Sequence, residues 1–309
     1  MKKKKKYQGV VIPAVTPLTA NHTLDEHAVE TMFDWFRSYE AMPFILGTTG
    51  EAASLSTAVK HHYIRLAARL KAAGETLYAG VSSNCLSETV EMAKHCFDEG
   101  VDVVVATVPT YYALTPDQMK TYFGQLADSI PGPLIIYNIP TTTHMSVPLE
   151  VIDSLSTHPN IVGTKDSERG EERLKASLAL WANREDFSHF LGWAAKSADA
   201  LINGGDGVVP STGNFSPGIY RDIYTAAEAG DNKKALELQV ISDQLGNLYQ
   251  SGRLLNSSLA TLKIIMQRTG LCDPYLMPPL TRLTAAEEAK VLLETEQAIK
   301  QHPRYFKNN

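Results

Sequence analysis

The segment IVGTKDS, residues 161–167, sets the expectation for the fold and points to the chemistry. A short apolar run ends in Lys165 and then breaks into polar residues, a pattern typical of a buried parallel strand that presents one charge at its C-terminal end. An ammonium group removed from water is costly unless it is paired or loses its proton, and a neutral amine attacks carbonyl compounds. Two structural interpretations compete: Asp166 neutralises the lysine, or Lys165 reaches solvent.

Similar apolar runs recur on both sides of this segment, and stretches with helical periodicity lie between them. The other strands are expected at Val10–Thr16, Phe44–Thr48, Leu77–Val81, Val101–Val108, Leu134–Ile139, Phe187–Gly192 and Gly207–Ser211. Eight strands alternating with helices predict a parallel sheet closed as a (β/α)8 TIM barrel. A doubly wound open sheet is the competing architecture, but its G-x-G-x-x-G turn does not follow the first strand, which runs into TPL at residues 16–18.

After the eighth strand only helical patterns continue, and the first of them is enough to close a barrel. These patterns cover Ile219–Ala229, Lys233–Tyr249, Leu259–Thr269 and Ala285–Gln301. We therefore predict a disordered basic tail over residues 1–8, a barrel over 9–230 and a C-terminal helical extension over 231–309.

Composition excludes several classes of protein. The chain has 309 residues, of which 44% are hydrophobic and 20% charged, as expected for a globular domain with a large core. No apolar run approaches the roughly 20 residues that span a membrane. The net charge of −5, despite five lysines at 2–6, argues against nucleic acid as a partner. No secretory signal is visible, and three scattered cysteines suggest neither disulfides nor zinc, so a cytoplasmic location is expected.

Polar residues gather where the predicted strands end, the side of such barrels that carries chemistry. The second strand runs into GTTGE at residues 47–51, where the backbone N–H groups of Thr48, Thr49 and Gly50 could hold a carboxylate. Tyr137 ends the strand before that of Lys165, and its phenol could shuttle protons in the same pocket. An ordinary helix-capping turn and an amphipathic core tyrosine are the alternatives.

Four motifs together, GTTGE (47–51), YNIP (137–140), GTKD (163–166) and GGDG (204–207), resemble the dihydrodipicolinate synthase / N-acetylneuraminate lyase family of pyruvate-dependent class I aldolases. The resemblance covers the chain from Gly9 to about Leu292. It implies that Lys165 forms a Schiff base with pyruvate or another 2-oxo acid. It also implies that Tyr137 is the general acid/base, and that neither a metal nor another cofactor is used.

The resemblance extends to further site residues and to assembly. It implies that Thr48 and Thr49 hold the substrate carboxylate with Gly50 beside them, and that Val209 and Ser211 lie at the pyruvate end. Thr48 would also join a proton relay with Tyr112, which reaches in from a neighbouring subunit. The resemblance thus implies a homotetramer built as a dimer of dimers.

Departures from the family pattern bear on the substrate. Members that make dihydrodipicolinate carry an arginine where this chain has Thr142, and a threonine can bind a hydroxyl but cannot pair with a carboxylate in bidentate fashion. Sialic-acid lyases carry acidic residues where WAAK follows at 193–196. The eighth-strand region looks most like that of 2-keto-3-deoxy sugar-acid aldolases. We therefore expect cleavage or formation of such a sugar acid, with pyruvate and an aldehyde as the components; synthase or sialic-acid lyase activity is the alternative.

Three further hypotheses stay open. A metal-dependent barrel enzyme needs converging ligands, whereas His61 and His62 are adjacent on a predicted helix and point apart. A phosphosugar-binding barrel would use Gly204–Gly207, which no lysine or arginine accompanies. A ligand sensor that has lost catalysis is disfavoured because both Lys165 and Tyr137 are present.

Overall fold

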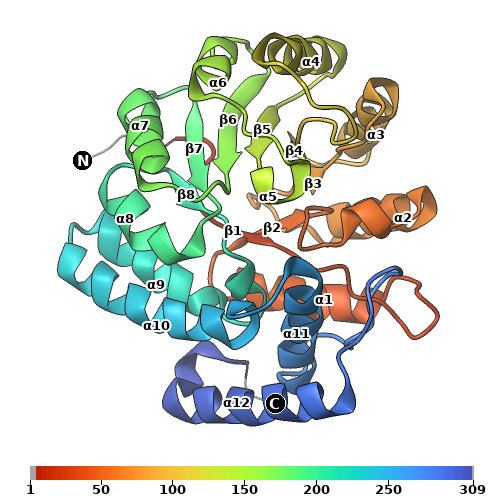
Figure 1. The fold of residues 1–309 in the computed structure, drawn as a ribbon, viewed down its shortest axis with the longest axis vertical. Coiled ribbons are helices and arrows are strands. Elements are labelled where there is room, and N and C mark those ends of the chain that lie inside the picture. The colour runs from red at the N-terminus through yellow and green to blue at the C-terminus, as the bar shows by residue number, and fades with distance from the viewer. Residues whose placement is uncertain (1–4, 308–309) are drawn as a thin grey trace.

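The computed structural model describes residues 5–307, and its centre is a closed barrel of eight parallel strands. The strands are β1 (Gly9–Pro13), β2 (Met42–Ile45), β3 (Tyr78–Gly80), β4 (Val103–Ala106), β5 (Leu134–Asn138), β6 (Ile161–Asp166), β7 (Ser188–Leu191) and β8 (Gly207–Val208). Each strand pairs with the next in the chain, and β8 closes the ring on β1. The predicted (β/α)8 barrel is confirmed (Figure 1).

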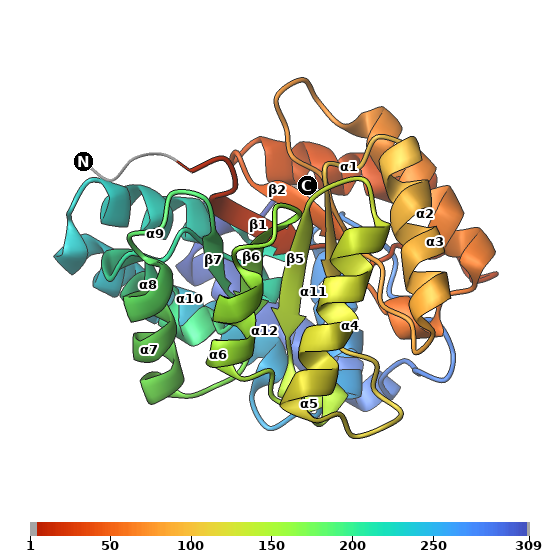
Figure 2. The ribbon, with the colours of Figure 1, turned by 90° about the horizontal axis from the view of Figure 1, so that it is seen from above.

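Helices follow the strands and surround the barrel (Figure 1). They are α1 (Glu26–Arg37), α2 (Thr57–Leu70), α3 (Leu86–Asp98), α4 (Pro116–Ser129), α5 (Pro140–Thr143), α6 (Leu149–Leu155), α7 (Glu171–Trp181), α8 (Ser197–Ile202) and α9 (Pro217–Glu228). Their apolar faces pack on the outer face of the sheet: α1, for example, buries Val29, Met32, Phe33 and Phe36. The single-turn helix α5 lies at the end of the barrel to which β5 points (Figure 2).

Three helices form the C-terminal extension, namely α10 (Asn232–Gln250), α11 (Leu255–Arg268) and α12 (Ala285–Gln301). They lie together at one side of the barrel (Figure 1), where α10 packs on α8 and α9, and α11 packs on α10 and α12. Within residues 5–307 none of the helices combines the length and apolarity that crossing a membrane requires.

Seven of the eight strands end earlier than the apolar runs that predicted them, whereas β6 continues one residue past Lys165 to Asp166. The expected strand Gly207–Ser211 pairs only over Gly207–Val208, since Pro210 has no N–H for the ladder and a 3₁₀ helix, Ser211–Asn214, begins directly after it. An apolar run reports burial, and loops at a barrel rim are buried as well. Strand ends inferred from burial alone therefore extend too far.

The N-terminal segment is ordered earlier than expected. Lys5 is buried, and its Nζ lies 2.7 Å from Asp206 Oδ2 and 2.8 Å from the carbonyl oxygen of Phe187. Tyr7 is buried as well, and its carbonyl accepts a hydrogen bond from Ser188 Oγ. The expectation of a disordered tail is wrong for residues 5–8, because a buried carboxylate gives Lys5 a specific partner. Residues 1–4 of that tail lie outside the described part of the chain.

A second, smaller core fills the inside of the barrel. Its members point inward from alternate positions of the strands and are Tyr7, Val11, Phe44, Tyr78, Val103, Val105, Ile135, Tyr137, Ile139, Phe190 and Val209. Side chains alternate between the two faces of a strand, so inward residues near the strand ends form the floor of any site at that rim. Tyr137 and Phe44 are such residues.

Candidate active site

Lys165 and Tyr137 are neighbours on adjacent strands inside the barrel. The register between β5 and β6 places Tyr137 directly beside Lys165. The Lys165 Nζ lies 3.7 Å from the centre of the Tyr137 ring and 4.9 Å from the centre of the Phe44 ring. Lys165 is only 5% exposed. The strand-end lysine is thus held between aromatic faces rather than extended to solvent.

The carboxylate next to Lys165 in the sequence does not neutralise it. Asp166 points to the other face of the strand, where Arg173 Nε lies 2.7 Å from its Oδ2. Among residues 5–307, Lys165 forms no ion pair with a carboxylate. Both structural interpretations of Lys165, neutralisation by Asp166 and extension into solvent, are therefore wrong.

The surroundings shift the proton equilibria of both side chains. Burial lowers the pKa of Lys165, and the nearby phenol of Tyr137 opposes this change only in part. For Tyr137, burial acts to raise the pKa, but the charge of Lys165 and hydrogen bonds with Lys165 and Thr48 act in the other direction and prevail, so the pKa is lowered. An amine that loses its proton more readily and a phenol that ionises more readily suit nucleophilic attack and proton transfer.

Thr48 completes the group from the loop after β2. Its Oγ1 lies 3.5 Å from the Tyr137 hydroxyl, which is the long limit of a hydrogen bond. The same loop is anchored by Glu51, whose Oε1 lies 2.5 Å from Lys263 Nζ and whose Oε2 accepts a hydrogen bond from the Met277 N–H. A buried ion pair to α11 therefore fixes the loop that presents Thr48.

A cavity of about 910 Å³ opens above these residues. Its wall includes Phe44, Thr48, Tyr137 and Thr142, and Lys165 lies against the two aromatic rings of that set. The wall continues past Thr107, Asn84 and Asn256 to Leu255 and Leu259 of α11. The volume is larger than pyruvate needs and is within the usual range for small-molecule sites.

Lys165 lies behind the aromatic rings and is not itself in this wall, and neither are the remaining residues singled out from the sequence. Gly50 is buried, and its carbonyl accepts a hydrogen bond from Thr16 Oγ1 at 2.6 Å, while Thr49 is partly exposed beside it. Val209 is buried inside the barrel with Tyr137. Ser211 turns towards the extension, where its Oγ lies 2.6 Å from the Tyr249 hydroxyl.

Tyr112 lies at the surface of the single chain with 73% of its area exposed. Its ring packs edge-on against Tyr111, which is exposed as well. The structure therefore does not bring Tyr112 to the Tyr137 hydroxyl within one chain.

The sequence did not single out Lys263, Arg173 or Phe44. The sequence does contain an indication for Lys263, because it is the one charge in the otherwise uncharged stretch Leu259–Gln267. A lysine buried with such a helix needs a carboxylate or hydrogen-bond acceptor as its partner. Arg173 had none, since an arginine in the first turns of an amphipathic helix usually faces solvent. Phe44 could not be distinguished from any other core residue of its strand.

The structure bears on two of the rival hypotheses, the metal-dependent enzyme and the phosphosugar-binding barrel. Among the described residues, His, Cys, Asp and Glu side chains form no group of three or more that could hold a metal ion. The GGDG segment lies at the opposite rim, where the Asp206 carbonyl accepts the Gly9 N–H at the start of β1. Gly204–Gly207 is therefore remote from the cavity, which weakens the phosphosugar hypothesis.

Comparisons with known proteins agree with this geometry. The family model of the dihydrodipicolinate synthetase family matches residues 6–301. A probable 2-dehydro-3-deoxy-D-pentonate aldolase of Escherichia coli is 30% identical, with 93% of this chain and 95% of that protein covered. A 4-hydroxy-tetrahydrodipicolinate synthase of Hyphomonas neptunium is 29% identical, with 92% of this chain and 96% of that protein covered.

The structure of a dihydrodipicolinate synthase from Bacteroides thetaiotaomicron superposes with a TM-score of 0.89 at 26% identity. The match covers 96% of this chain and 100% of that one. A match over nearly the whole chain, on a barrel with a buried lysine at the end of its sixth strand, identifies the family. The chain belongs to the dihydrodipicolinate synthetase family and, like its members, is a lyase of the class I aldolase type.

Proposed function

We propose that this protein is a Schiff-base aldolase that cleaves or forms a 2-oxo acid, with pyruvate as one component and Lys165 as the nucleophile. The observation that carries the proposal is the position of the Lys165 amine, which is buried, has no carboxylate partner among residues 5–307 and lies 3.7 Å from the ring centre of Tyr137. In this setting burial lowers the pKa of Lys165, so a neutral amine is available to attack a carbonyl carbon.

Addition to the 2-oxo carbon and removal of the C4 hydroxyl proton each have a group to perform them. The Lys165 amine adds to the 2-oxo carbon, and loss of water gives a protonated imine. The C3–C4 bond then breaks as Tyr137, through Thr48, takes the proton of the C4 hydroxyl, and the bonding electrons move into the imine. The products are a free aldehyde and an enamine, which is protonated at C3 and hydrolysed to pyruvate. The 3.5 Å separation of the Thr48 and Tyr137 hydroxyl oxygens supports the relay.

The carboxylate of the 2-oxo acid is assigned to the loop after β2. Thr48 and Thr49 would bind it through their hydroxyl and backbone N–H groups, with Gly50 allowing the close approach. Val209 and Ser211 would lie at the pyruvate end of the pocket. Of these residues, Thr48 has the most direct support because it lines the cavity.

The preferred substrates are 2-keto-3-deoxy sugar acids. The wall beyond Tyr137 offers hydroxyl and amide groups from Thr107, Thr142 and Asn84. Its charged members among the described residues are glutamates and Lys60, and none of them is an arginine. Neutral groups of this kind suit the hydroxyls of a sugar chain, whereas a second carboxylate is usually held by an arginine fork. The similarity to the Escherichia coli pentonate aldolase points the same way.

Synthase activity of the kind named for the Hyphomonas relative is the second candidate. It is favoured by the number of relatives with that name, and it is opposed by Thr142. A panel of aldehydes that carry either neutral polyol tails or charged amino-acid tails separates the two, because each candidate predicts turnover with one group and not with the other.

We assign the assembly, a homotetramer built as a dimer of dimers, from the family. The exposed pair Tyr111 and Tyr112 supports it, since two large rings at the surface are typical of an interface. In such a dimer Tyr112 would extend the proton relay of the neighbouring subunit. Sedimentation analysis of the protein and of Tyr112→Ala tests this assignment: the variant should dissociate and lose activity together.

The central experiment is borohydride reduction in the presence of pyruvate, followed by intact mass measurement and peptide mapping. One pyruvyl adduct on Lys165 is expected, and an unmodified Lys165 contradicts the proposal. Tyr137→Phe is the companion variant. It should still form the adduct, while turnover falls on the order of 10²–10⁴-fold, the usual contribution of a general acid/base. Full turnover by that variant would exclude the assigned role of Tyr137.

A further inference from the structure

The strands that carry Lys165 and Tyr137 hold a second pair of side chains one residue further on. The register that places Tyr137 beside Lys165 places Asn138 beside Asp166. Because side chains alternate along a strand, the first pair points into the barrel and the second points out towards the helices. Any contact that fixes the outer pair therefore also fixes the backbone that carries the inner pair.

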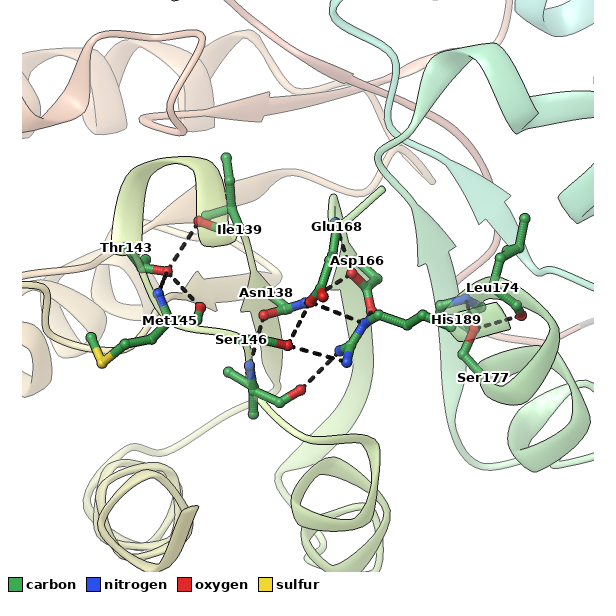
Figure 3. A network of polar contacts seen from close by, with 12 residues as sticks. Asn138, Ile139, Thr143, Met145, Ser146, Asp166, Glu168, Leu174, Ser177 and His189 are labelled. Carbon is green, nitrogen blue, oxygen red and sulfur yellow. Dashed lines mark hydrogen bonds and ion pairs between the residues drawn. The ribbon is translucent and has the colours of Figure 1, made fainter. Parts of the chain in front are cut away.

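The outer pair is joined directly and is held further by the loops that follow both strands. Asn138 Nδ2 donates to Asp166 Oδ1 at 3.0 Å and to Glu168 Oε2 at 2.9 Å. On its other side, Asn138 Oδ1 accepts the Val147 N–H at 2.9 Å. Ser146 Oγ donates to Glu168 Oε2, and Figure 3 shows these side chains gathered between the two strand ends. The amide of Asn138 is therefore fully engaged.

Arg173, from the start of α7, closes this network. Its Nε lies 2.7 Å from Asp166 Oδ2 and 3.3 Å from Glu168 Oε2, and its Nη2 donates to the Val147 carbonyl at 2.9 Å. One guanidinium thus links the end of β6, the loop after β6 and the loop after α5. Burial raises the pKa of Asp166, and Arg173 opposes that change, as a planar donor with several N–H groups does for a buried carboxylate.

We propose that Arg173 is a positioning residue: through Asp166 and Asn138 it sets the relative placement of Lys165 and Tyr137 and thereby the rate of the chemical step. This inference rests on the proposed catalytic roles of those two residues. Asn138 and Asp166 point to the outer side of the strands, away from Tyr137 and Lys165, and Arg173 pairs with Asp166 there, so the network acts from behind the site and not through the substrate. Displacements of about 1 Å at a reacting group reduce rates by about 100-fold, so a cross-link one residue away is well placed to matter.

The test separates rate from folding by counting competent sites. Borohydride trapping with pyruvate gives the number of sites that form the adduct, and kcat is then expressed per trapped site. For Arg173→Met we expect kcat per trapped site to fall by about 10- to 100-fold, while KM changes by much less. Arg173→Lys keeps the charge and one contact, and it should recover part of the loss. If Arg173→Met folds poorly, the kcat per trapped site of Arg173→Lys tests the same prediction.

Arg184 supplies the matched control. It is a partly buried arginine beyond the far end of α7, it pairs with Asp186 at 2.7 Å, and it donates to the Ser156 carbonyl at 3.1 Å. Arg184→Met therefore removes a comparable set of bonds that is not attached to the ends of β5 and β6. Its kcat per trapped site should equal that of the unaltered protein, even where its unfolding temperature is lower.

The outcomes are distinct. If the unaltered protein traps no pyruvate, the proposed function fails, and the positioning role fails with it. If it traps pyruvate but Arg173→Met keeps kcat per site within about twofold, only the positioning role is overturned and the network serves folding alone. An equal loss in Arg184→Met overturns it as well. A loss confined to Arg173→Met, with partial rescue by lysine, supports it.

Discussion

Lys165 and Lys263 are both buried, yet their surroundings differ in one respect. Lys263, in the extension, is 1% exposed at its side chain. Its Nζ forms an ion pair with Glu51 Oε1 at 2.5 Å and donates hydrogen bonds to the carbonyls of Thr16 at 2.8 Å and Tyr275 at 2.6 Å. Lys165 faces aromatic rings instead and forms no ion pair with the described residues. Burial alone does not make a nucleophile. Burial without a counter-charge does, because it lowers the pKa of the amine and so raises the fraction that is neutral.

Replacing Lys165 should have the largest effect on activity and little effect on folding. In Lys165→Met we expect turnover to fall on the order of 10⁶-fold, as when other covalent nucleophiles are removed, and no adduct to form. Its unfolding temperature should equal or exceed that of the unaltered protein, because an unpaired buried amine is exchanged for an apolar chain. Kinetic assays and thermal unfolding measure the two effects. A marked loss of stability would show that Lys165 is a structural lysine like Lys263.

Replacing Lys263 should reverse this pattern. Lys263→Met leaves the carboxylate of Glu51 buried without its counter-charge, and breaking such a pair costs about 3–5 kcal/mol. We expect a clear drop in the unfolding temperature and in the denaturant midpoint, while the sites that stay folded still trap pyruvate on Lys165. Loss of trapping in fully folded protein would instead place Lys263 in the chemistry.

The double variant Lys263→Met with Glu51→Gln sharpens the comparison. With both charges removed, more than half of the stability lost in Lys263→Met should return, because no unpaired buried charge is left. Recovery stays incomplete, since the carbonyls of Thr16 and Tyr275 still lack their donor. Thermal unfolding of the single and double variants gives the coupling. No recovery at all would mean that the packing of Lys263, rather than its charge, is what matters.

The pH dependence of adduct formation is the smallest of these effects. Burial lowers the pKa of Lys165 from the ordinary value of 10.5, so the neutral fraction rises with pH and is complete at a lower pH than for an exposed lysine. The rate of imine formation with pyruvate, followed by rapid borohydride quenching, should rise and then level off below pH 10.5. A rate still rising through that pH would show that Lys165 behaves as an ordinary lysine.

Much of the barrel was predictable because its cause is local. Eight buried strands read as apolar runs, and helices between them show a period of about 3.6 residues, so element order followed directly from pattern. The predicted C-terminal ends of β1 and β8 lie beyond the observed ones, because the buried loops that follow these strands are as apolar as the strands themselves. The order of residues 5–8 was missed because the partner of Lys5 is Asp206, far away in the chain.

By itself, the sequence determined which residues stand at the ends of the strands, and hence that Lys165, Tyr137 and Thr48 share one rim. Alternation and strand order are enough for that conclusion. Only the tertiary structure decided which charges are paired. Asp166 forms an ion pair with Arg173, Glu51 forms one with Lys263, and Lys165 contacts aromatic rings. The physical reason is that burial periodicity is a property of neighbouring residues, whereas pairing depends on contacts between segments that only the closed barrel brings together.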